Sequence, residues 1–323
     1  MDTLKLDIKT DKNLLAFSGG IDSTALFFIM LSQKIPFDIA IVDYQQRQQS
    51  KEEVIYATQL AHKYNKKCFI SQYPSDLKFS EKDARDYRHN FFHNIMMDDG
   101  YKTLLTAHQL NDKLEWFLMQ LTKGAGLTEL IGMESFTHKS HYYIQKPLLH
   151  LSKKNLQKYL DKNSIKYFID QSNYDEKYKR NYFRHNFSNE LLEKFESGIG
   201  KSFTYLENDN RSLFNDVEVT KNKELSIYDF NGDTNIGLRI IDKELKQRGI
   251  IISNATRQEI VTKKSLVVSH KIAITITDSK IFIAPFISET MNKRFKERCR
   301  VSKIPVNIRA YIHRLYQENL FIF

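Results

Sequence analysis

Hydrophobic residues in the first half of the chain occur as short continuous runs that alternate with longer helical patterns. The short runs predict buried strands at residues 14–17, 37–42, 67–71 and 103–107. The patterns between them predict helices at residues 25–31, 50–64, 80–97 and 111–121. Strands and helices that alternate in this way form a parallel sheet covered by helices on both faces. We therefore expect an α/β fold with a doubly wound parallel sheet.

The pattern changes in the second half of the chain. After a polar, turn-rich stretch at 170–179, few turn signals follow, and this predicts a helical linker. Further strands are expected at 225–230, 265–269 and 272–277, with helices at about 236–247 and 255–263. The predicted organisation is a catalytic domain over residues 1–186, a helical linker over 187–216 and a smaller α+β domain over 217–323.

The connection between the first strand and the first helix consists of small and polar residues. In order they are Ser18, Gly19, Gly20, Ile21, Asp22 and Ser23. Such a turn places backbone N–H groups at a helix N-terminus, where they can bind phosphate oxygens. The two serines add hydroxyl donors, and Asp22 adds a carboxylate that can hold Mg²⁺ beside a pyrophosphate. The alternative is a glycine turn in which Asp22 is an ordinary helix cap.

This run has the form SGGxDS. It has neither the lysine of a Walker loop nor the GxGxxG of a dinucleotide fold. It resembles the pyrophosphate-binding loop of ATP-dependent adenylating enzymes.

Composition limits location and partners. The chain has 323 residues, 41% of them hydrophobic, and its 49 Lys and Arg against 39 Asp and Glu give a net charge of +10. That surplus suits a polyanionic partner. Cys68 and Cys299 are too far apart for a CxxC motif and indicate a reducing compartment. No apolar run approaches the ~20 residues of a bilayer span, so we expect a cytoplasmic protein that binds no membrane.

Further polar residues follow the predicted strands. Asp43 ends the strand at 37–42, and His108 follows the strand at 103–107. His108, Asp112 and Glu115 are spaced as on one helix face, where they can bind Mg²⁺, hold an ammonium group or accept a proton. The alternative is a solvated helix face with a histidine cap. Ligands of parallel sheets bind beyond the carboxyl ends of the strands, and this position favours the functional interpretation.

Two arginine pairs offer charged donors for phosphates. Arg180 and Arg184 are four residues apart, with Asn181 between them, and Arg85 and Arg88 lie among aromatic residues on a predicted helix. The alternative partners of Arg180 and Arg184 are the acidic residues Asp170, Asp175 and Glu176.

Taken together, residues 13–187 resemble the tRNA(Ile)-lysidine synthetase family of N-type ATP pyrophosphatases. The resemblance rests on SGGIDS (18–23), VDYQQR (42–47), ARDYR (84–88), TAHQLNDKLE (106–115), KGAGLTELIGM (123–133), KPLL (146–149) and DQSNYDEKYKRNYFR (170–184). The chain departs from the family pattern at Gln109 (usually histidine), Trp116 (threonine) and Lys146 (arginine). VDYQQR also lacks the histidine and glycine of the usual VDHGLR, although the principal charged positions are kept.

The resemblance implies an adenine nucleotide alpha-hydrolase-like sheet and an ATP-dependent ligase. ATP activates C2 of the wobble cytidine in a CAU-anticodon tRNA(Ile), and the ε-amine of free L-lysine then attacks that carbon, giving lysidine, AMP and pyrophosphate. Residues Ser18–Ser23 would bind the ATP phosphates, with Mg²⁺ at Asp22. Asp112 and Glu115 would position lysine and cytidine, with Asp43 and His108 nearby. The phosphate or anticodon contacts would come from Arg85, Arg88, Arg180 and Arg184.

Several points stay open at this stage. They are the oligomeric state, with a homodimer as one option, and which carboxylate serves lysine, cytidine or Mg²⁺. Another adenylating tRNA-modifying enzyme is an alternative, although a thiolase generally needs paired cysteines. A non-catalytic, basic RNA-binding adaptor is a second alternative, and it would release no pyrophosphate.

A run of cations near the C-terminus forms a last candidate. Six cations stand against Glu297 alone within eleven residues, namely Lys293, Arg294, Lys296, Arg298, Arg300 and Lys303. They predict either a solvated surface or a site that binds the tRNA backbone. In the second case the affinity for tRNA would fall steeply with salt concentration.

Overall fold

The computed structural model describes residues 5–8, 10–46, 48–74, 80–139, 141–170 and 177–323. The chain divides into two compact units, Met1–Leu206 and Glu207–Phe323. The boundary falls inside helix α8 (Asn189–Ser212), so the separate linker over residues 187–216 stays a prediction. Among the described residues, no helix has both the length and the apolar character needed to cross a bilayer.

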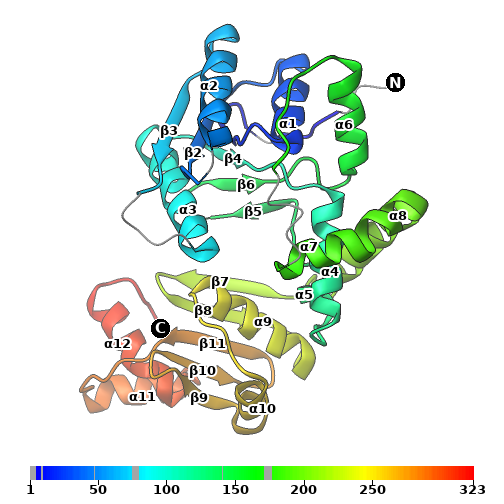
Figure 1. Cartoon of the computed structure of the whole chain (residues 1–323). Coiled ribbons are helices and arrows are strands. Elements are labelled where there is room, and N and C mark those ends of the chain that lie inside the picture. The colour runs from blue at the N-terminus through cyan, green and yellow to red at the C-terminus, as the bar shows by residue number, and fades with distance from the viewer. Residues whose placement is uncertain (1–4, 9, 47, 75–79, 140, 171–176) are drawn as a thin grey trace. The chain divides into compact units, whose positions relative to one another are not determined.

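The first unit contains a six-stranded sheet in the order β3-β2-β1-β4-β6-β5 (Figure 1). Its strands are β1 (Asn13–Ala16), β2 (Phe37–Asp43), β3 (Cys68–Gln72), β4 (Thr103–Leu105), β5 (Phe136–His138) and β6 (Tyr143–Gln145). All neighbouring pairs are parallel except β5 and β6, which are antiparallel. The predicted parallel sheet is confirmed, whereas the short strands β5 and β6 were not predicted.

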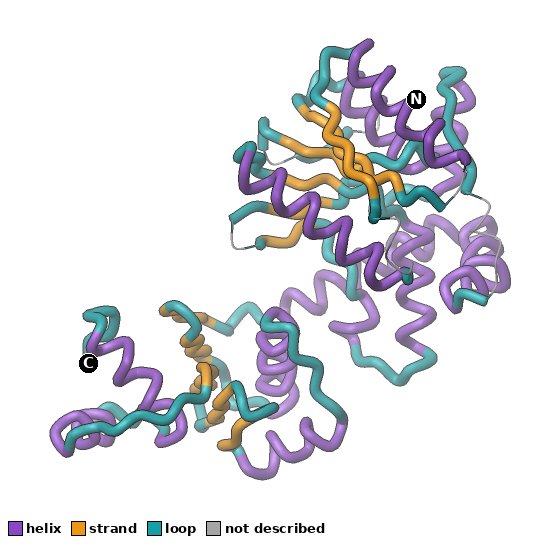
Figure 2. The backbone as a smooth tube through the Cα atoms, turned by 60° about the vertical axis from the view of Figure 1, so that its left-hand side comes forward, coloured by secondary structure: helices purple, strands orange, loops and turns teal. Residues whose placement is uncertain are grey.

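Helices cover both faces of this sheet, as Figure 2 shows. They are α1 (Ile21–Ser32), α2 (Gln48–Lys63), α3 (Glu81–Asp98) and α6 (Lys153–Lys162). On one face, Leu15 and Ile39 pack in a core with α1, α2 and α6, and on the other, Leu14 and Leu104 pack with α3. Successive strand residues point to opposite faces, so a strand buried on both sides reads as an unbroken apolar run.

The strand order places a ligand crevice beside β1. From β1 the chain adds β2 and β3 on one side and later returns to place β4 on the other side, with Leu15 paired to both Ile39 and Leu105. The loops after β1 and β4 therefore leave the sheet next to each other, at the kind of switch point where α/β sheets bind ligands. These two loops carry the SGGIDS run and His108.

A group of helices follows β4 in the sequence. It comprises α4 (Leu110–Leu121), α5 (Leu127–Ile131), α7 (Lys179–Phe183), a π-helical turn (Arg184–Ser188) and α8. Leu110 and Leu114 of α4 pack with Leu192 and Phe203 of α8. A turn at residues 122–124 separates α4 from α5, and α5 was not predicted.

Trp116 fixes α5 against α4. Its Nε1 donates to the carbonyl of Glu129 at 2.8 Å. Gly132 ends α5 at φ 25°, and a Cβ there would lie 2.1 Å from that Nε1. The tryptophan at the usual threonine position therefore needs a glycine opposite it.

Serine side chains cap two of the helices that cover the sheet. Ser80 and Ser152 cap α3 and α6, and each accepts a hydrogen bond from the backbone N–H three residues on. α2 begins at Gln48, two residues before the helix predicted at 50–64.

The second unit is a five-stranded antiparallel sheet in the order β7-β8-β11-β10-β9. Its strands are β7 (Glu218–Asn222), β8 (Leu225–Asp229), β9 (Ser265–Val268), β10 (Ile272–Ile276) and β11 (Lys280–Pro285). One core packs Ile274 and Ile283 with α9 (Thr234–Gln247) and α10 (Asn254–Lys263). Another packs Ala273 and Phe282 with α11 (Lys293–Val301), a 3₁₀ turn (Val306–Ile308) and α12 (Arg309–Gln317). The predicted α+β class is confirmed, although β7, α11 and α12 were not predicted.

Candidate active site

The SGGIDS run forms an open N-terminus of α1. Gly20 is the N-cap residue, and no side chain in the described chain caps the helix there. Ser23 Oγ accepts the N–H of Ser18 at 3.1 Å and donates to the carbonyl of Gly20 at 3.3 Å, which closes the loop on itself. Gly19 has φ 73°, a conformation that glycine adopts without strain. The helix N-terminus is therefore free to bind an anion.

Asp22 is the residue that this loop leaves unsatisfied. It stands inside the first turn of α1, so it is not the helix cap that the alternative interpretation required. Its Oδ1 is buried and has no hydrogen-bond partner among the described residues. Burial, together with the charges of Asp112 and Glu115, raises the pKa of Asp22 to about 7 against the opposing charges of Lys153 and Arg184. A buried oxygen without a donor is a natural ligand for a cation.

His108 lies before α4, contrary to the prediction that it shares a helix face with Asp112 and Glu115. β4 ends at Leu105, and Gln109 is the extended N-cap residue of α4, so helical spacing does not reach His108. Its Nδ1 lies 3.1 Å from Thr106 Oγ1. Burial lowers the pKa of His108 to about 4, and the charge of Asp112 only partly opposes this effect. The imidazole is therefore neutral at pH 7.

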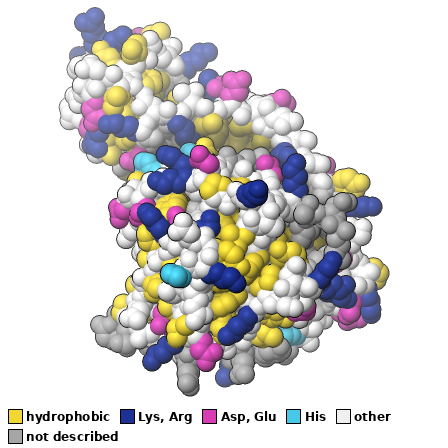
Figure 3. All heavy atoms as spheres, turned by 90° about the horizontal axis from the view of Figure 1, so that it is seen from above, with side chains coloured by type: hydrophobic (Ala, Val, Ile, Leu, Met, Phe, Trp, Pro, Cys, Tyr) yellow, Lys and Arg dark blue, Asp and Glu magenta, His cyan; other side chains and the backbone are white. Residues whose placement is uncertain are grey.

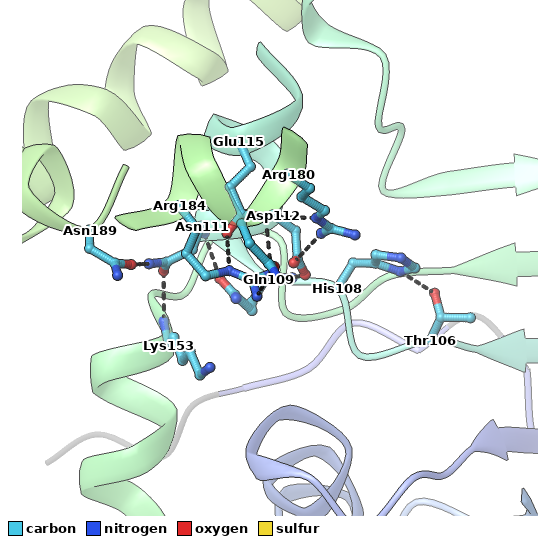
Figure 4. Close-up of polar contacts among 11 residues, drawn as sticks. Thr106, His108, Gln109, Asn111, Asp112, Glu115, Lys153, Arg180, Arg184 and Asn189 are labelled. Atoms are coloured by element: carbon cyan, nitrogen blue, oxygen red, sulfur yellow. Dashed lines mark hydrogen bonds and ion pairs between the residues drawn. The ribbon is translucent and has the colours of Figure 1, made fainter. Parts of the chain in front are cut away.

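Asp112 and Glu115 form ion pairs with Arg180 and Arg184 (Figure 4). Glu115 Oε2 accepts from Arg180 Nε at 2.7 Å and from Arg184 Nη2 at 3.2 Å, while its Oε1 accepts from Arg184 Nε at 2.7 Å. Arg180 also reaches Asp112 Oδ1, and Asp112 Oδ2 caps α4 by accepting the N–H of Gln109 at 3.0 Å. We call these four charged residues the ion-pair network.

The ion-pair network joins residues that the sequence assigned to separate roles. The candidate lysine-binding acids and the candidate phosphate-binding arginines neutralise one another. Glu115 is 0% exposed and Asp112 is 9% exposed. Of the alternative acidic partners, Asp175 and Glu176 lie outside the described residues, as does Arg47 of the VDYQQR motif.

Three residues at the site were not predicted from the sequence. Asn111 Oδ1 accepts the backbone N–H of Lys153 at 3.0 Å, and its amide lies 3.5 Å from Asn189 Oδ1, which ties α4 to α6 and α8. The charge of Lys153 reaches Asp22. The sequence signal for Lys153 is its place directly after Ser152, a residue type that favours helix N-caps.

The remaining predicted residues lie around this centre. Asp43 ends β2 and is buried, with its Oδ1 accepting the N–H of Gln45 at 2.9 Å. Arg85 and Arg88 are both exposed on α3. The charge of Arg88 adds to burial in lowering the pKa of His108, and Arg88 hydrogen-bonds Tyr44. Burial and the charges of Arg88 and Arg85 lower the pKa of His89. The structure thus brings Arg88 near His108, and no described contact does the same for Arg85.

Metal and charge give two further constraints. Among the described residues, no three His, Cys, Asp or Glu side chains group as a metal site, so a cation here would rest on Asp22 and on substrate oxygens. On the face drawn in Figure 3, Lys and Arg side chains are dispersed among neutral and apolar ones. On that face, the net charge of +10 is not concentrated in one patch.

Known proteins match this chain over nearly its full length. A PP-loop domain matches residues 2–191. The tRNA(Ile)-lysidine synthase of Campylobacter jejuni (strain NCTC 11168) is 39% identical over 95% of this chain and 94% of its own. Those of Wolinella succinogenes and Helicobacter pylori (strain 26695) are 40% and 38% identical over 94% and 95% of this chain, and over 93% and 90% of their own.

A solved structure with much lower sequence identity also resembles this chain. A U34-tRNA thiolase from Methanococcus maripaludis shares 15% identity and superposes with a TM-score of 0.50 over 64% of this chain and 74% of its own. At that identity the likeness concerns the fold alone. The PP-loop domain and the full-length relatives show that this chain belongs to the tRNA(Ile)-lysidine synthase family.

Proposed function

We propose that this chain joins free lysine to C2 of the wobble cytidine in a CAU-anticodon tRNA(Ile), with ATP as the activating substrate. One observation carries the proposal most directly. The unsatisfied carboxylate of Asp22 stands at an open helix N-terminus, and its neighbours are the ion-pair network and Lys153. A phosphate-binding terminus and a neutral imidazole on the two adjoining loops suit adenylation followed by attack of an amine.

ATP phosphates fit the N-terminus of α1. The Ser18–Ser23 loop offers backbone N–H groups and two hydroxyls, and Lys153 and Arg184 bring positive charge towards Asp22. Asp22 Oδ1 suits Mg²⁺, which is commonly held by one or two carboxylates together with substrate phosphates. Bound there, Mg²⁺ would neutralise the charge that develops as pyrophosphate leaves.

The bond changes divide into two steps. The O2 atom of cytidine attacks the α-phosphorus of ATP, and the bond to pyrophosphate breaks. The lysine ε-amine then attacks C2, the C2–O2 bond breaks, and AMP leaves with that oxygen. The amine is a nucleophile only after losing a proton, since its ordinary pKa is about 10.4. His108 follows β4 on the loop beside the SGGIDS run, and this position makes it our candidate for taking part in that proton transfer.

The burial of the acids suggests a division of roles. Asp112, the more accessible acid of the ion-pair network, and Asp43 at the end of β2 are our candidates for contacting lysine or cytidine. Glu115 has both oxygens on arginines, so we assign it to positioning Arg180 and Arg184. Those arginines, with Arg85 and Arg88 of α3, are our candidates for contacts to phosphates or the anticodon.

The test is nucleoside analysis of an unmodified tRNA. A CAU-anticodon tRNA(Ile) transcript is incubated with the protein, ATP, Mg²⁺ and lysine, then digested and analysed by mass spectrometry. We expect lysidine with one AMP and one pyrophosphate per product. A transcript whose wobble base is guanine is the matched control and should stay unmodified. Pyrophosphate release without lysidine would point to another adenylating enzyme, and no release at all would point to an adaptor.

A further inference from the structure

The segment that supplies Arg180 and Arg184 also carries exposed aromatic rings. Tyr182 and Phe187 are 45% and 41% exposed, whereas Phe183 between them in sequence is only 7% exposed. The ring centroids of Tyr182 and Phe187 are 5.8 Å apart, and those of Phe183 and Phe187 are 5.7 Å apart. We call the exposed rings of Tyr182 and Phe187 the aromatic platform.

Local bonds hold the aromatic platform in place. Arg180 and Arg184 are four residues apart and share the side of the segment that meets Glu115, while Tyr182 stands two positions from each and faces away. In the π-helical turn, Ser188 Oγ donates to the carbonyl of Phe183 at 3.0 Å, and Asn186 donates to that of Tyr182 at 3.0 Å. π-Helical turns often occur at functional sites. The outer rings are therefore pre-positioned by the same backbone that holds the ion-pair network.

The chemistry of this surface fits an unpaired nucleobase. Single-stranded RNA is commonly recognised by stacking its splayed bases on aromatic rings. Lys179, exposed on the same helix, adds positive charge for the neighbouring phosphates. A base-paired stem cannot offer the face of a base, whereas an anticodon loop can.

We propose that the aromatic platform stacks on a nucleobase that flanks the wobble cytidine. This inference rests on the proposed function and extends it to the way in which the anticodon loop is held. Stacking of a flanking base on the protein replaces its stacking on the cytidine, which favours a splayed cytidine whose C2 is open to attack.

A double-mutant cycle tests the stacking. Tyr182→Ala and Phe187→Ala are each combined with tRNA that is abasic at the nucleotide 5′ or 3′ of the wobble cytidine, and the Kd and the KM for tRNA are measured. Loss of one ring or of its base should weaken binding by about tenfold. Loss of a ring together with the base that stacks on it should weaken binding no more than loss of either alone. Tyr182→Phe keeps the ring and should bind tRNA like the wild type.

Tyr205→Ala is the matched control, because Tyr205 on α8 is 66% exposed and lies outside the aromatic platform. It should leave tRNA affinity unchanged. The inference would be overturned if the loss of a ring and the loss of a base weakened tRNA binding additively at both flanking positions. It would also be overturned if both platform variants bound tRNA as tightly as the wild type. Lysidine formation by the wild type tests the proposed function separately. The inference would also be wrong if the platform variants only shifted a dimer to monomers, which would identify a protein interface.

Discussion

Two carboxylates with buried oxygens, one in each unit, have opposite environments. Asp22 in the first unit has a buried oxygen without a partner, and its pKa is raised to about 7. Glu244 on α9 of the second unit is 4% exposed, yet its pKa is lowered to about 2. Burial alone would raise both values, so burial does not explain the difference.

The donors around Glu244 explain its low pKa. Its Oε1 accepts from Ser226 Oγ at 2.9 Å and from Arg248 Nη2 at 2.9 Å, and its Oε2 accepts from Tyr228 and from Lys221 at 3.2 Å. Burial opposes ionisation, but these hydrogen bonds and charges outweigh it. Four partners from β7, β8 and the C-cap of α9 converge on one carboxylate and join the sheet to the helix.

The comparison separates a structural acid from a candidate binding acid. The second unit satisfies its buried charge within the chain, so Glu244 contributes to stability and offers nothing to a ligand. The first unit buries Asp22 next to two other acids without donors for its Oδ1, which costs stability until a cation or phosphate-bound metal arrives. An unsatisfied group is thus more informative about function than a buried one.

The strongest test of this contrast is Asp22→Asn. The amide removes the negative charge that suits Mg²⁺, so we expect lysidine formation to fall by about 10²–10³-fold. The protein should fold normally, as judged by circular dichroism and Tm. Turnover near that of the wild type would show that Asp22 does not take part in the reaction.

The counterpart substitution is Glu244→Gln. It leaves Arg248 and Lys221 facing a neutral group, and we expect the free energy of unfolding to fall by about 3 kcal/mol. Urea unfolding of the full chain measures this change. Activity per folded molecule should be unchanged at low temperature. If Glu244→Gln lost activity without losing stability, the structural assignment of this acid would be wrong.

The pH dependence of stability sharpens the contrast. Because folding raises the pKa of Asp22 from 3.8 to about 7, the folded state holds a proton that the unfolded state has lost, and the contribution of Asp22 to wild-type stability falls as pH rises from about 4 to 7. Asp22→Asn lacks this loss, so its stability relative to wild type should grow by at least about 1 kcal/mol over that range. His108, whose pKa is lowered to about 4, acts in the opposite direction in both proteins and cancels. Parallel curves of Tm against pH would contradict the raised pKa.

Sequence patterns predicted the parts of the site that lie within single loops. The SGGIDS run stands between a strand and a helix, as small residues at such a junction indicate, and Asp43 ends its strand. The pairing of Arg180 and Arg184 with Asp112 and Glu115 was missed. Those contacts join residues 65 to 69 positions apart, and local spacing carries no information on such distances.

The elements missed in the fold have a related cause. β7 is exposed at four of its five positions, so it shows no apolar alternation. α11 buries only Phe295 and Cys299, and its charges made it look like a surface run rather than a helix. β5 and β6 have three residues each, too few for a period to be seen.

The cations of α11 extend the contrast to positive charge. Arg298 donates to Tyr316 and lies over the Phe323 ring, and Arg300 pairs with Glu297, so these two support the structure. Among the described residues, the exposed side chains of Lys293, Arg294 and Lys296 make no hydrogen bond or ion pair.

We therefore expect Arg294→Glu with Lys296→Glu to weaken tRNA binding several-fold and to flatten its salt dependence, since fewer counterions are released. Binding across a salt series measures this effect. Arg298→Glu with Arg300→Glu makes the same charge change at two partnered positions and should have a smaller effect on the slope. Equal slopes in all three proteins would make the run a solvated surface.

The smallest expected effect concerns how Asp43 obtains its donor. Gln45 has φ 54°, a left-handed conformation, at the position where VDHGLR has glycine, and its N–H reaches Asp43 Oδ1 at 2.9 Å. Gln45→Ala and Gln45→Gly both lose the side-chain bond to the carbonyl of Tyr73, but only glycine relieves the backbone. We expect the glycine variant to be more stable than the alanine variant by about 1 kcal/mol in urea unfolding. Glu52, an exposed position inside α2, is the control. There we expect Glu52→Ala to be more stable than Glu52→Gly, because glycine destabilises a helix interior. If alanine were also the better residue at position 45, the left-handed backbone would not be what aims this donor at Asp43.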